Sequence, residues 1–368
     1  MYKPYIPETL PINSIDWVSL ISKIGEANRA VAEFNGILNA IKNPNLLLSP
    51  LVRDEALLSS KIEGTQVDTI DVLKYEAGLK ENSEARKGDI VEILNYRKSI
   101  QFGAEELERC SISVYMIKQL HQILLNHARG QDKNPGDFRK VQNYIGSMVG
   151  GIENARFVPP DPLTVDACMD NLVDYINSEE KDVLVQAAIF HAQFEIIHPF
   201  CDGNGRLGRM LVPLFLYQKK IISNPVLYIS KYMDLNEMRY KDSLREITSN
   251  NNWTQWIAFF LDAIIWQSKS NYKIAKAIME YYDRTKNKIL EITSSKHAVP
   301  LLDAMFAKVM FMQTSLKLDT HPSRATIYNL LQSLEKAQIL KRVSDSAGSV
   351  GAVYSLYELL DIANGSDF

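Results

Sequence analysis

The chain has little cysteine, and none of it is paired in sequence. Cys110, Cys168 and Cys201 are the three cysteines among 368 residues, and no CxxC spacing occurs. A scattered, odd-numbered set excludes a disulfide framework and a cysteine-based zinc ribbon as the organising feature of the fold. We therefore expect the protein to work in a reducing compartment, the cytoplasm.

The sequence also lacks a dominant charge and any apolar run of membrane-spanning length. Lys and Arg number 41 against 44 Asp and Glu, a formal net charge of -3, which argues against a general polyanion binder but leaves local patches open. The segment Met1 to Pro11 holds three prolines and has no signal-peptide pattern. We expect no secretion and no membrane insertion, and the hydrophobic content of 46% predicts a large buried core.

Helical periodicity of apolar residues dominates the chain and predicts a mainly α fold. The expected helices before the central loop are Ile15 to Ile41, Leu47 to Lys61, Asp89 to Phe102, Val114 to Asn126, Val165 to Asn177 and Val183 to Ile197. The segment Val141 to Pro160 differs, because its glycines and closing prolines favour a β-hairpin or extended flap. After a helix from Trp253 to Ser268, the charged stretch Asn271 to Ile292 is expected to be a connecting helix.

The tail after residue 297 has the pattern of a winged helix-turn-helix. Its expected elements are a helix from Leu301 to Met310, a short helix near Gln313, a helix capped by Ser323 that runs to Gln338, and strands Ile339 to Val343 and Ala352 to Tyr357 around a turn at Ser346 to Gly351. Such a module can bind DNA or serve as a scaffold for protein contacts. From Lys296 onward, seven Lys and Arg face seven Asp and Glu, so the charge does not favour DNA.

One short segment, His198 to Arg209, combines groups that handle a triphosphate. It reads HPFCDGNGRLGR and lies between two apolar helical runs, where a loop enters a helix N-terminus. Backbone N–H groups and the helix dipole favour a bound anion at that place, and glycines let the backbone approach it closely. The alternative is a purely structural role, in which a glycine-rich loop begins a helix, the histidine has hydrogen-bond partners within the protein and the arginines lie on the surface.

Each polar residue of this loop has a chemical use. His198 can remove the proton of an attacking hydroxyl, and Asp202 offers hard oxygen ligation to Mg²⁺. The Gly203, Asn204 and Gly205 stretch can form an anion cradle, in which the Asn204 amide also contacts phosphate. The guanidiniums of Arg206 and Arg209 complete the clamp. Cys201 is expected to be a small filler.

The loop resembles the Fic-family motif HPFx[D/E]GNGRxxR at every defined position. With the flanking helices the resemblance covers roughly two-thirds of the chain. It implies a helical Fic core and a transfer of AMP from ATP, with Mg²⁺, to a Ser, Thr or Tyr hydroxyl of a target protein, the chain itself included. It also implies that Arg206 reaches the β-phosphate and Arg209 the γ-phosphate, and it extends the ATP-binding set through Leu207 and Gly208.

The resemblance also implies a domain organisation and an internal inhibitor. We expect an N-terminal helical region at 1–110 with an inhibitory helix at about 47–64, a catalytic core at 111–270, a connecting helix at 271–297 and a winged-helix-like domain at 298–368. Ser59-Ser60-Lys61-Ile62-Glu63-Gly64 fits the family's inhibitory pattern [S/T]xxxE[G/N]. Glu63 and Ser59 share a helix face, so Glu63 can form a bidentate pair with Arg209 and contact the ATP site. Alone, Glu63 would be assigned to a solvated surface.

Two further regions are similar to family elements. Gly136-Asp137-Phe138-Arg139 and the following residues resemble the flap over the active site, with Asn143, Tyr144, Ile145 and Gly146 nearest nucleotide and target. Tyr240 is the candidate for an adenine or ribose contact, with core packing as its alternative role. The family often has Asn-Arg and Tyr-Tyr where this chain has Asn236-Glu237 and Tyr240-Lys241.

Other functions stay open at this stage. One alternative is a DNA-binding transcriptional regulator whose Fic domain senses ATP. Within the enzyme class, the transfer of UMP, phosphoryl transfer and removal of AMP from a modified target remain alternatives. The target protein, the signal that releases Glu63 and the oligomeric state, a homodimer included, are not fixed by these residues.

Overall fold

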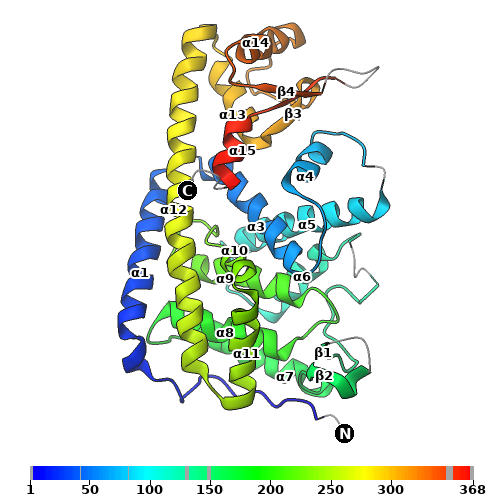
Figure 1. Ribbon diagram of the computed structural model, residues 1–368, viewed down its shortest axis with the longest axis vertical. Helices are drawn as coiled ribbons and strands as arrows, with labels where there is room; N and C mark the ends of the chain where they lie inside the picture. The colour runs from blue at the N-terminus through cyan, green and yellow to red at the C-terminus, as the bar shows by residue number, and fades with distance from the viewer. Residues whose placement is uncertain are drawn as a thin grey trace. The chain divides into compact units, whose positions relative to one another are not determined.

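The computed structural model describes residues 3–41, 43–81, 83–128, 132–146, 151–344 and 351–364, and helices dominate them (Figure 1). The prediction of a mainly α fold is confirmed. The chain forms two compact units. The first unit consists of residues up to 36, 58–65 and 91–269, and the second of 37–57, 66–90 and the residues from 270 onward. The boundaries expected at 110, 270 and 297 stay predictions.

The helices predicted for the first two hundred residues are present, with small shifts at their ends. They are α1 (Trp17–Ala40), α3 (Ser49–Ile62), α5 (Glu84–Glu106), α6 (Val114–Leu124), α7 (Val165–Asn177) and α8 (Val183–Ile197), and the shorter α2 (Pro44–Leu47) and α4 (Thr69–Glu76) add to them. Within the described ranges, no helix is both long and apolar enough to cross a membrane.

The core of the first unit is built around α8, which packs against α7 and α9 (Asn204–Gln218). Asp182 caps α8 at its start, where its carboxylate accepts hydrogen bonds from the backbone N–H groups of Leu184 and Val185, both at 2.9 Å. Nearly every side chain of α8 and α9 is buried. A buried pair of helices of this kind gives the short loop between them a rigid support.

The helices α10 (Ser230–Leu235), α11 (Glu237–Asn250) and α12 (Trp253–Thr293) follow α9. The sequence predicts two helices over residues 253–292, but α12 is continuous (Figure 1). The polar residues near 268–271 do not interrupt it because Ser268 and Asn271 are buried rather than placed in a turn. That part of the prediction was wrong.

The predicted flap hairpin is present in the first unit. The strands β1 (Ile145–Gly146) and β2 (Ala155–Phe157) pair antiparallel, with Ile145 opposite Phe157. Short 3₁₀ turns, η1 (Gly151–Asn154) and η2 (Pro162–Thr164), flank β2. Residues 147–150 lie outside the described ranges.

The second unit carries a small antiparallel sheet with the order β3 (Met310–Met312), β5 (Val353–Ser355) and β4 (Lys341–Ser344). Its helices in the tail are α13 (Ala298–Lys308), the short η3 (Gln313–Ser315), α14 (Arg324–Lys336) and α15 (Tyr357–Asn364). Ser323 caps α14 as predicted, since its hydroxyl accepts from the Thr326 N–H at 3.1 Å. The turn expected at 346–351 falls mostly outside the described residues.

Two elements of the tail differ from the prediction. The helix expected to reach Met310 ends at Lys308, because Val309 adopts a left-handed φ of 62°, and Met310 then starts a strand. Tyr357 was expected to end a strand, but it begins α15, whose Leu359 and Ile362 are buried. The assignment of the tail as a winged-helix-like domain stays a prediction.

Candidate active site

His198 stands directly at the end of α8, in the first unit. Its backbone is left-handed, with φ 48° and ψ 60°, and its N–H donates to Phe194 O at 3.0 Å. Such a conformation is unfavourable for a residue with a Cβ unless its surroundings hold it. The side chain is half-buried, and its Nδ1 is a buried nitrogen without a hydrogen-bond partner among the described residues. A nitrogen buried in this way is out of reach of a target hydroxyl.

The buried Arg139 holds the backbone of His198 in place. Its Nε donates to His198 O at 2.9 Å, and its Nη2 donates to Pro160 O at 2.6 Å and to Ile197 O at 3.3 Å. The cation thereby caps the C-terminal carbonyls of α8, where the helix dipole favours positive charge. Arg139 was named in the sequence only as part of the flap, so this role was missed.

Electrostatics keep the His198 imidazole neutral near pH 7. Burial lowers the pKa of His198 to about 4, and the Glu63 carboxylate only partly opposes this effect. A neutral imidazole can accept a proton, whereas an imidazolium cannot. The pKa of His198 therefore fits a general base, and this catalytic role stays a prediction.

The loop after His198 turns into α9 through Gly203. Gly203 is the N-cap residue of α9 and has a left-handed φ of 79°, which glycine adopts at little cost. Asp202 Oδ1 accepts from the Gly203 N–H at 2.7 Å. The first turn of α9 therefore presents its backbone N–H groups beside Asp202, as the sequence predicted for an anion cradle.

Asn204 fastens the same loop. Its Oδ1 accepts from Phe200 N at 2.9 Å, and its Nδ2 donates to Phe200 O at 2.8 Å. We predicted that the Asn204 side-chain amide binds phosphate. Both its Oδ1 and its Nδ2 instead form hydrogen bonds with the backbone of the loop. That Asn204 belongs to the ATP-binding residues stays a prediction. Its backbone N–H could still donate a hydrogen bond to phosphate.

His121, to which the sequence assigns no role, contacts the loop between α8 and α9. Its Nδ1 accepts from Gly136 N at 2.8 Å, so its Nε2 carries the proton and donates to Asp202 O at 2.9 Å. Its ring stacks on Phe200 with centroids 3.7 Å apart. Burial lowers the pKa of His121 to about 4, which preserves this neutral tautomer. No local motif in the sequence signals a contact that joins α6 to the loop.

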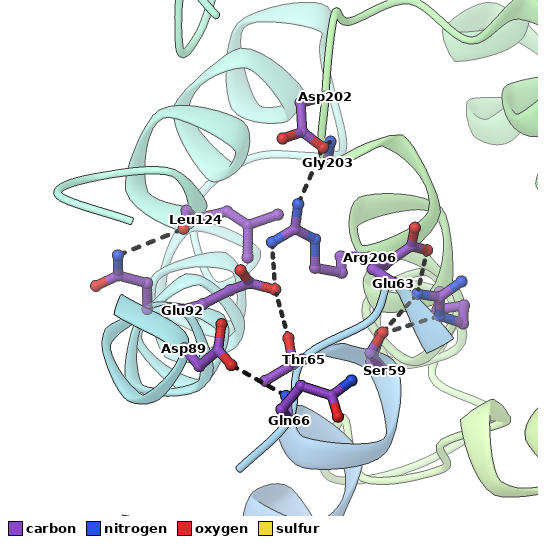
Figure 2. A network of polar contacts seen from close by, with 12 residues as sticks. Ser59, Glu63, Thr65, Gln66, Asp89, Glu92, Leu124, Asp202, Gly203 and Arg206 are labelled. Carbon is purple, nitrogen blue, oxygen red and sulfur yellow. Dashed lines mark hydrogen bonds and ion pairs between the residues drawn. The ribbon is translucent and has the colours of Figure 1, made fainter. Parts of the chain in front are cut away.

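Arg209 is held by the end of α3. Its Nη2 donates to Glu63 Oε1 at 2.9 Å and to Ser59 O at 2.8 Å, and its Nε donates to Ser59 Oγ at 3.0 Å (Figure 2). The helix ends at Ile62, and Gly64 follows with φ +96°. Ser59, Glu63 and Arg209 therefore meet as predicted. The Arg209 guanidinium contacts both Glu63 and Ser59, and its bidentate pairing with Glu63 stays a prediction.

The Glu63 carboxylate lies in a space that only a glycine leaves open. A Cβ on Gly205 would lie 2.3 Å from Glu63 Oε1 and 2.9 Å from Arg209 Nη1. Gly205 is in the first turn of α9, so the carboxylate lies at the helix N-terminus beside a guanidinium. Helix N–H groups, an arginine and an open glycine form an anion seat. We use this name for the space bounded by Gly205 and Arg209.

The charges of Glu63 and Arg209 stabilise each other. Burial alone would raise the pKa of Glu63, but Arg209, with smaller contributions from Arg206 and His198, holds it below its usual value. Burial would likewise lower the pKa of Arg209, and Glu63 raises it instead. Glu63 therefore stays ionised at neutral pH, and the anion seat holds a negative charge.

Arg206, the other clamp arginine, is enclosed by two carboxylates. Its Nη1 lies 2.6 Å from Glu92 Oε1, and its Nη2 lies 3.2 Å from Asp202 Oδ1 (Figure 2). The side chains of Arg206 and Glu92 are 1% and 0% exposed, whereas that of Asp202 is 36% exposed. Glu92 was not predicted, because nothing in its local sequence on α5 points to the loop.

Tyr240 lies in the core of the first unit. Its hydroxyl contacts His191 Nε2 at 3.1 Å, and its ring packs near Trp256 and Phe259. Burial and the nearby Glu195 raise the pKa of Tyr240, and Arg209 opposes them. Tyr240 thus has the packing role that the sequence offers as its alternative. Its contact with a nucleotide stays a prediction.

Leu207 and Gly208 pack α9 against α8. Leu207 is fully buried, and a Cβ on Gly208 would lie 2.4 Å from Glu195 Oε1. His191 Nδ1 contacts Gly208 O at 3.1 Å. These two positions hold the helix that carries the anion seat, and their place in the ATP-binding set stays a prediction.

The flap is tied to the loop at Asn143. Its Nδ2 donates to Phe200 O at 3.2 Å. Tyr144 is half-buried, and Ile145 is 42% exposed. Gly146 has φ +151°, and a Cβ there would lie 2.8 Å from Arg156 N, so the strand pairing requires glycine. The structure therefore ties this segment to the loop at Asn143 and pairs it with β2 at Ile145 and Gly146, and the role of these four residues in target binding stays a prediction.

Asp202 is the residue available to a divalent cation. The described residues contain no group of three or more His, Cys, Asp or Glu side chains that could hold a metal. Mg²⁺ is commonly held by one or two carboxylates together with substrate phosphates and water. A partly exposed carboxylate beside the anion seat fits that pattern, and Asp202 as a magnesium ligand stays a prediction.

Comparisons with known proteins match this part of the chain. Residues 21–105 match the family model "Fic/DOC family N-terminal", and residues 111–216 match "Fic/DOC family". A probable protein adenylyltransferase of Aquifex aeolicus is 31% identical over 202 residues, which are 52% of this chain and 57% of that protein. A protein adenylyltransferase of Caenorhabditis elegans is 33% identical over 112 residues, 30% of this chain and 20% of that protein.

The same comparison extends to solved structures. A crystal structure of a Fic family protein from Desulfovibrio desulfuricans aligns with a TM-score of 0.56 at 20% identity, over 96% of this chain and 98% of that one. At this identity the likeness concerns the fold. The present chain spans only about half or less of the length of the adenylyltransferases that it matches.

Proposed function

Because this chain belongs to the Fic/DOC family, we propose that it is a protein adenylyltransferase that Glu63 restrains. It transfers AMP from ATP to a Ser, Thr or Tyr hydroxyl of a protein. The names of its relatives support the reaction class. The geometry of the loop from His198 to Arg209 supports the reaction itself.

One observation carries the proposal: a carboxylate of the chain occupies the anion seat. Glu63 Oε1 is 2.9 Å from Arg209 Nη2 and lies against Gly205. A terminal phosphate oxygen has the same charge sign and the same hydrogen-bonding requirements as this carboxylate. The γ-phosphate of ATP and Glu63 therefore compete for one place, and ATP reaches its reactive pose when Glu63 leaves.

In the transfer, the His198 imidazole accepts the proton of the target hydroxyl. The hydroxyl oxygen attacks the α-phosphorus, the bond from that phosphorus to the bridging oxygen breaks, and pyrophosphate leaves. Arg206 and Arg209 stabilise the charge that develops on the leaving group, together with the backbone N–H groups at the start of α9. Arg139 keeps the base in its left-handed backbone position throughout.

Asp202 would hold Mg²⁺ when the nucleotide is bound. The ion would neutralise charge between the α- and β-phosphates, and the protein supplies one carboxylate to it. Asp202 is oriented for this purpose through Gly203 N and through His121, which binds its backbone carbonyl. The flap at Asn143 to Gly146 would align the target segment, because an extended backbone can pair with a peptide strand.

The experiment that tests the proposal uses α-labelled ATP. The Glu63→Gly protein is incubated with labelled nucleotide and cell extract, and label on protein is followed by electrophoresis. We expect transfer by Glu63→Gly, much less by the unaltered chain, and none by the Glu63→Gly, His198→Ala double variant. Equal labelling by the double variant would overturn the role of His198. Absence of labelling in all three, with any nucleotide, would overturn the proposed activity.

A further inference from the structure

Glu92 joins two features of the site that the sequence treats separately. Its Oε1 lies 2.6 Å from Arg206 Nη1, and the same oxygen accepts from the Thr65 hydroxyl at 3.2 Å (Figure 2). Thr65 follows Glu63 by two residues, so it belongs to the segment that inhibits the site. We propose that Glu92 is a positioning residue that aims Arg206 at the nucleotide and also anchors the inhibitory segment through Thr65.

The first half of the proposal rests on the burial of the pair. The side chains of Glu92 and Arg206 are 0% and 1% exposed, and Thr65 is 3% exposed. A buried guanidinium without a counter-charge is strongly disfavoured, so Glu92 is its lasting partner. The opposite contact of Arg206 is to Asp202, which is partly exposed. Glu92 therefore holds the guanidinium at Nη1 and leaves Nη2 directed toward Asp202 and the nucleotide.

The second half rests on the chain that connects the two arginines. Ser59 and Glu63 contact Arg209, and Thr65 contacts the partner of Arg206. The inhibitory segment is thus attached at both ends of the clamp. When Glu63 leaves the anion seat, the Thr65 hydroxyl still holds the segment to Glu92, and a loss of this bond makes departure of Glu63 easier.

The test for the first half measures nucleotide binding, so it does not depend on transfer. Binding of ATP, ADP and AMP in magnesium buffer is measured by calorimetry in the Glu63→Gly, His198→Ala background, with and without Glu92→Gln. Because the family resemblance assigns Arg206 to the β-phosphate, we expect Glu92→Gln to weaken ATP and ADP by about tenfold and AMP not at all. The Glu92→Asp variant keeps the charge and is expected to lose less.

Other outcomes overturn this half. An equal loss for all three nucleotides, or no loss, would mean that Glu92 supports only the fold. Tighter binding of ADP would mean that Glu92 competes with phosphate and does not aim Arg206. The inference rests on the proposed function for its meaning, yet the two fail separately. If labelling never occurs while ADP binding depends on Glu92, the transferase assignment fails and the positioning role stands.

The test for the second half keeps the buried ion pair intact, in case Glu92→Gln does not fold. Thr65→Val removes the hydroxyl and keeps the shape, and Thr65→Ser keeps the hydroxyl as the matched control. With Glu63 present, we expect Thr65→Val to tighten ATP binding by about threefold and Thr65→Ser to leave it unchanged. In the Glu63→Gly background, Thr65→Val should have no effect. An equal effect in both backgrounds, or none in either, would overturn the anchor.

Discussion

The Arg209 Nη2 atom lies 2.9 Å from Glu63 Oε1, at a place where Gly205 has no side chain to exclude an anion. The two residues are 146 positions apart in sequence, and the end of α3 and the first turns of α9 bring them together. Arg209 can give its guanidinium either to Glu63 or to a phosphate. In the proposed function, this choice sets the activity of the site.

Replacing Glu63 by glycine should raise the transfer of AMP. The substitution removes the anion that competes with the γ-phosphate, and a charge-assisted hydrogen bond of this kind corresponds to an increase on the order of ten- to hundredfold. Initial rates of label transfer measure it. The Glu63→Gln variant keeps the shape without the charge and should give an intermediate rate. An unchanged rate in both variants would mean that Glu63 is no inhibitor. If Glu63 also positions water, the same variants lose AMP from modified target more slowly.

Adding one methyl group at Gly205 should block the anion seat. The Cβ of Gly205→Ala would lie 2.3 Å from Glu63 Oε1 and 2.9 Å from Arg209 Nη1, so neither carboxylate nor phosphate keeps its place. In the Glu63→Gly background we expect at least about tenfold weaker ATP binding and a matching loss of transfer. Gly25→Ala, on an exposed face of α1 with open space around it, is the control. Normal ATP binding by Gly205→Ala would show that the phosphate lies elsewhere.

Changing Arg139 to lysine should slow the chemical step without weakening ATP binding. A lysine keeps the charge but cannot reach the carbonyls of His198, Ile197 and Pro160 together as the guanidinium does. Loss of alignment of His198 should lower kcat by about tenfold or more. Arg156→Lys, on the exposed side of β2, provides the matched control. A rise in KM for ATP with unchanged kcat would contradict the assignment.

Acidification should destabilise the protein through its buried histidines. Burial lowers the pKa of His121 to about 4 and of His191 to about 3, both below the ordinary 6.5. Below about pH 6.5 the unfolded chain binds protons that the folded chain does not. The free energy of unfolding therefore decreases as the pH is lowered, by about 2 kcal/mol per fully buried histidine from pH 7 to pH 5. Glu195, whose pKa burial raises to about 7, acts in the opposite direction.

The contribution of a single histidine can be separated from that of Glu195. We expect His121→Gln to lose less stability between pH 7 and 5 than the unaltered chain, because the variant has one titrating group fewer. Chemical denaturation at both pH values measures the difference. Equal losses in the two proteins would show that His121 is not held neutral.

Removing the charge of Asp202 should raise the magnesium requirement. Asp202→Asn keeps an oxygen for Gly203 N but loses the anionic ligand, so the Mg²⁺ concentration for half-maximal transfer should increase by about tenfold or more. Asp137→Asn, an exposed change on the segment before the flap, should not alter it. A reduced maximal rate with the same Mg²⁺ dependence would assign Asp202 a role in orienting Arg206 and none in metal binding.

The residues that could be predicted from sequence are those carried by short motifs. The loop from His198 to Arg209 and the pattern from Ser59 to Gly64 each hold their parts within a few positions, and helix periodicity placed α7 and α8 correctly. The meeting of Glu63 with Arg209 was expected from the family resemblance of these two motifs, because Glu63 alone would be assigned to a solvated surface. Local sequence therefore accounts for most of the helices and for the choice of candidate site residues.

The supporting residues could not be predicted, because long-range packing selects them. Glu92 and His121 reach the loop from α5 and α6, and neither lies in a pattern that differs from an ordinary helix face. Val309 has a backbone conformation that β-branched residues rarely adopt, so no propensity rule ends α13 there. In each case, contacts between residues far apart in sequence determine the position or the conformation of the residue. A short stretch of sequence does not contain this information.

The competition for Arg209 is tested most directly by calorimetric binding of ATP and ADP to the His198→Ala protein, with and without Glu63→Gln. Because Glu63 occupies the seat of the γ-phosphate alone, the account predicts that Glu63→Gln tightens ATP binding by about tenfold or more and leaves ADP binding nearly unchanged. An equal gain for ATP and ADP, or no gain for ATP, would contradict it.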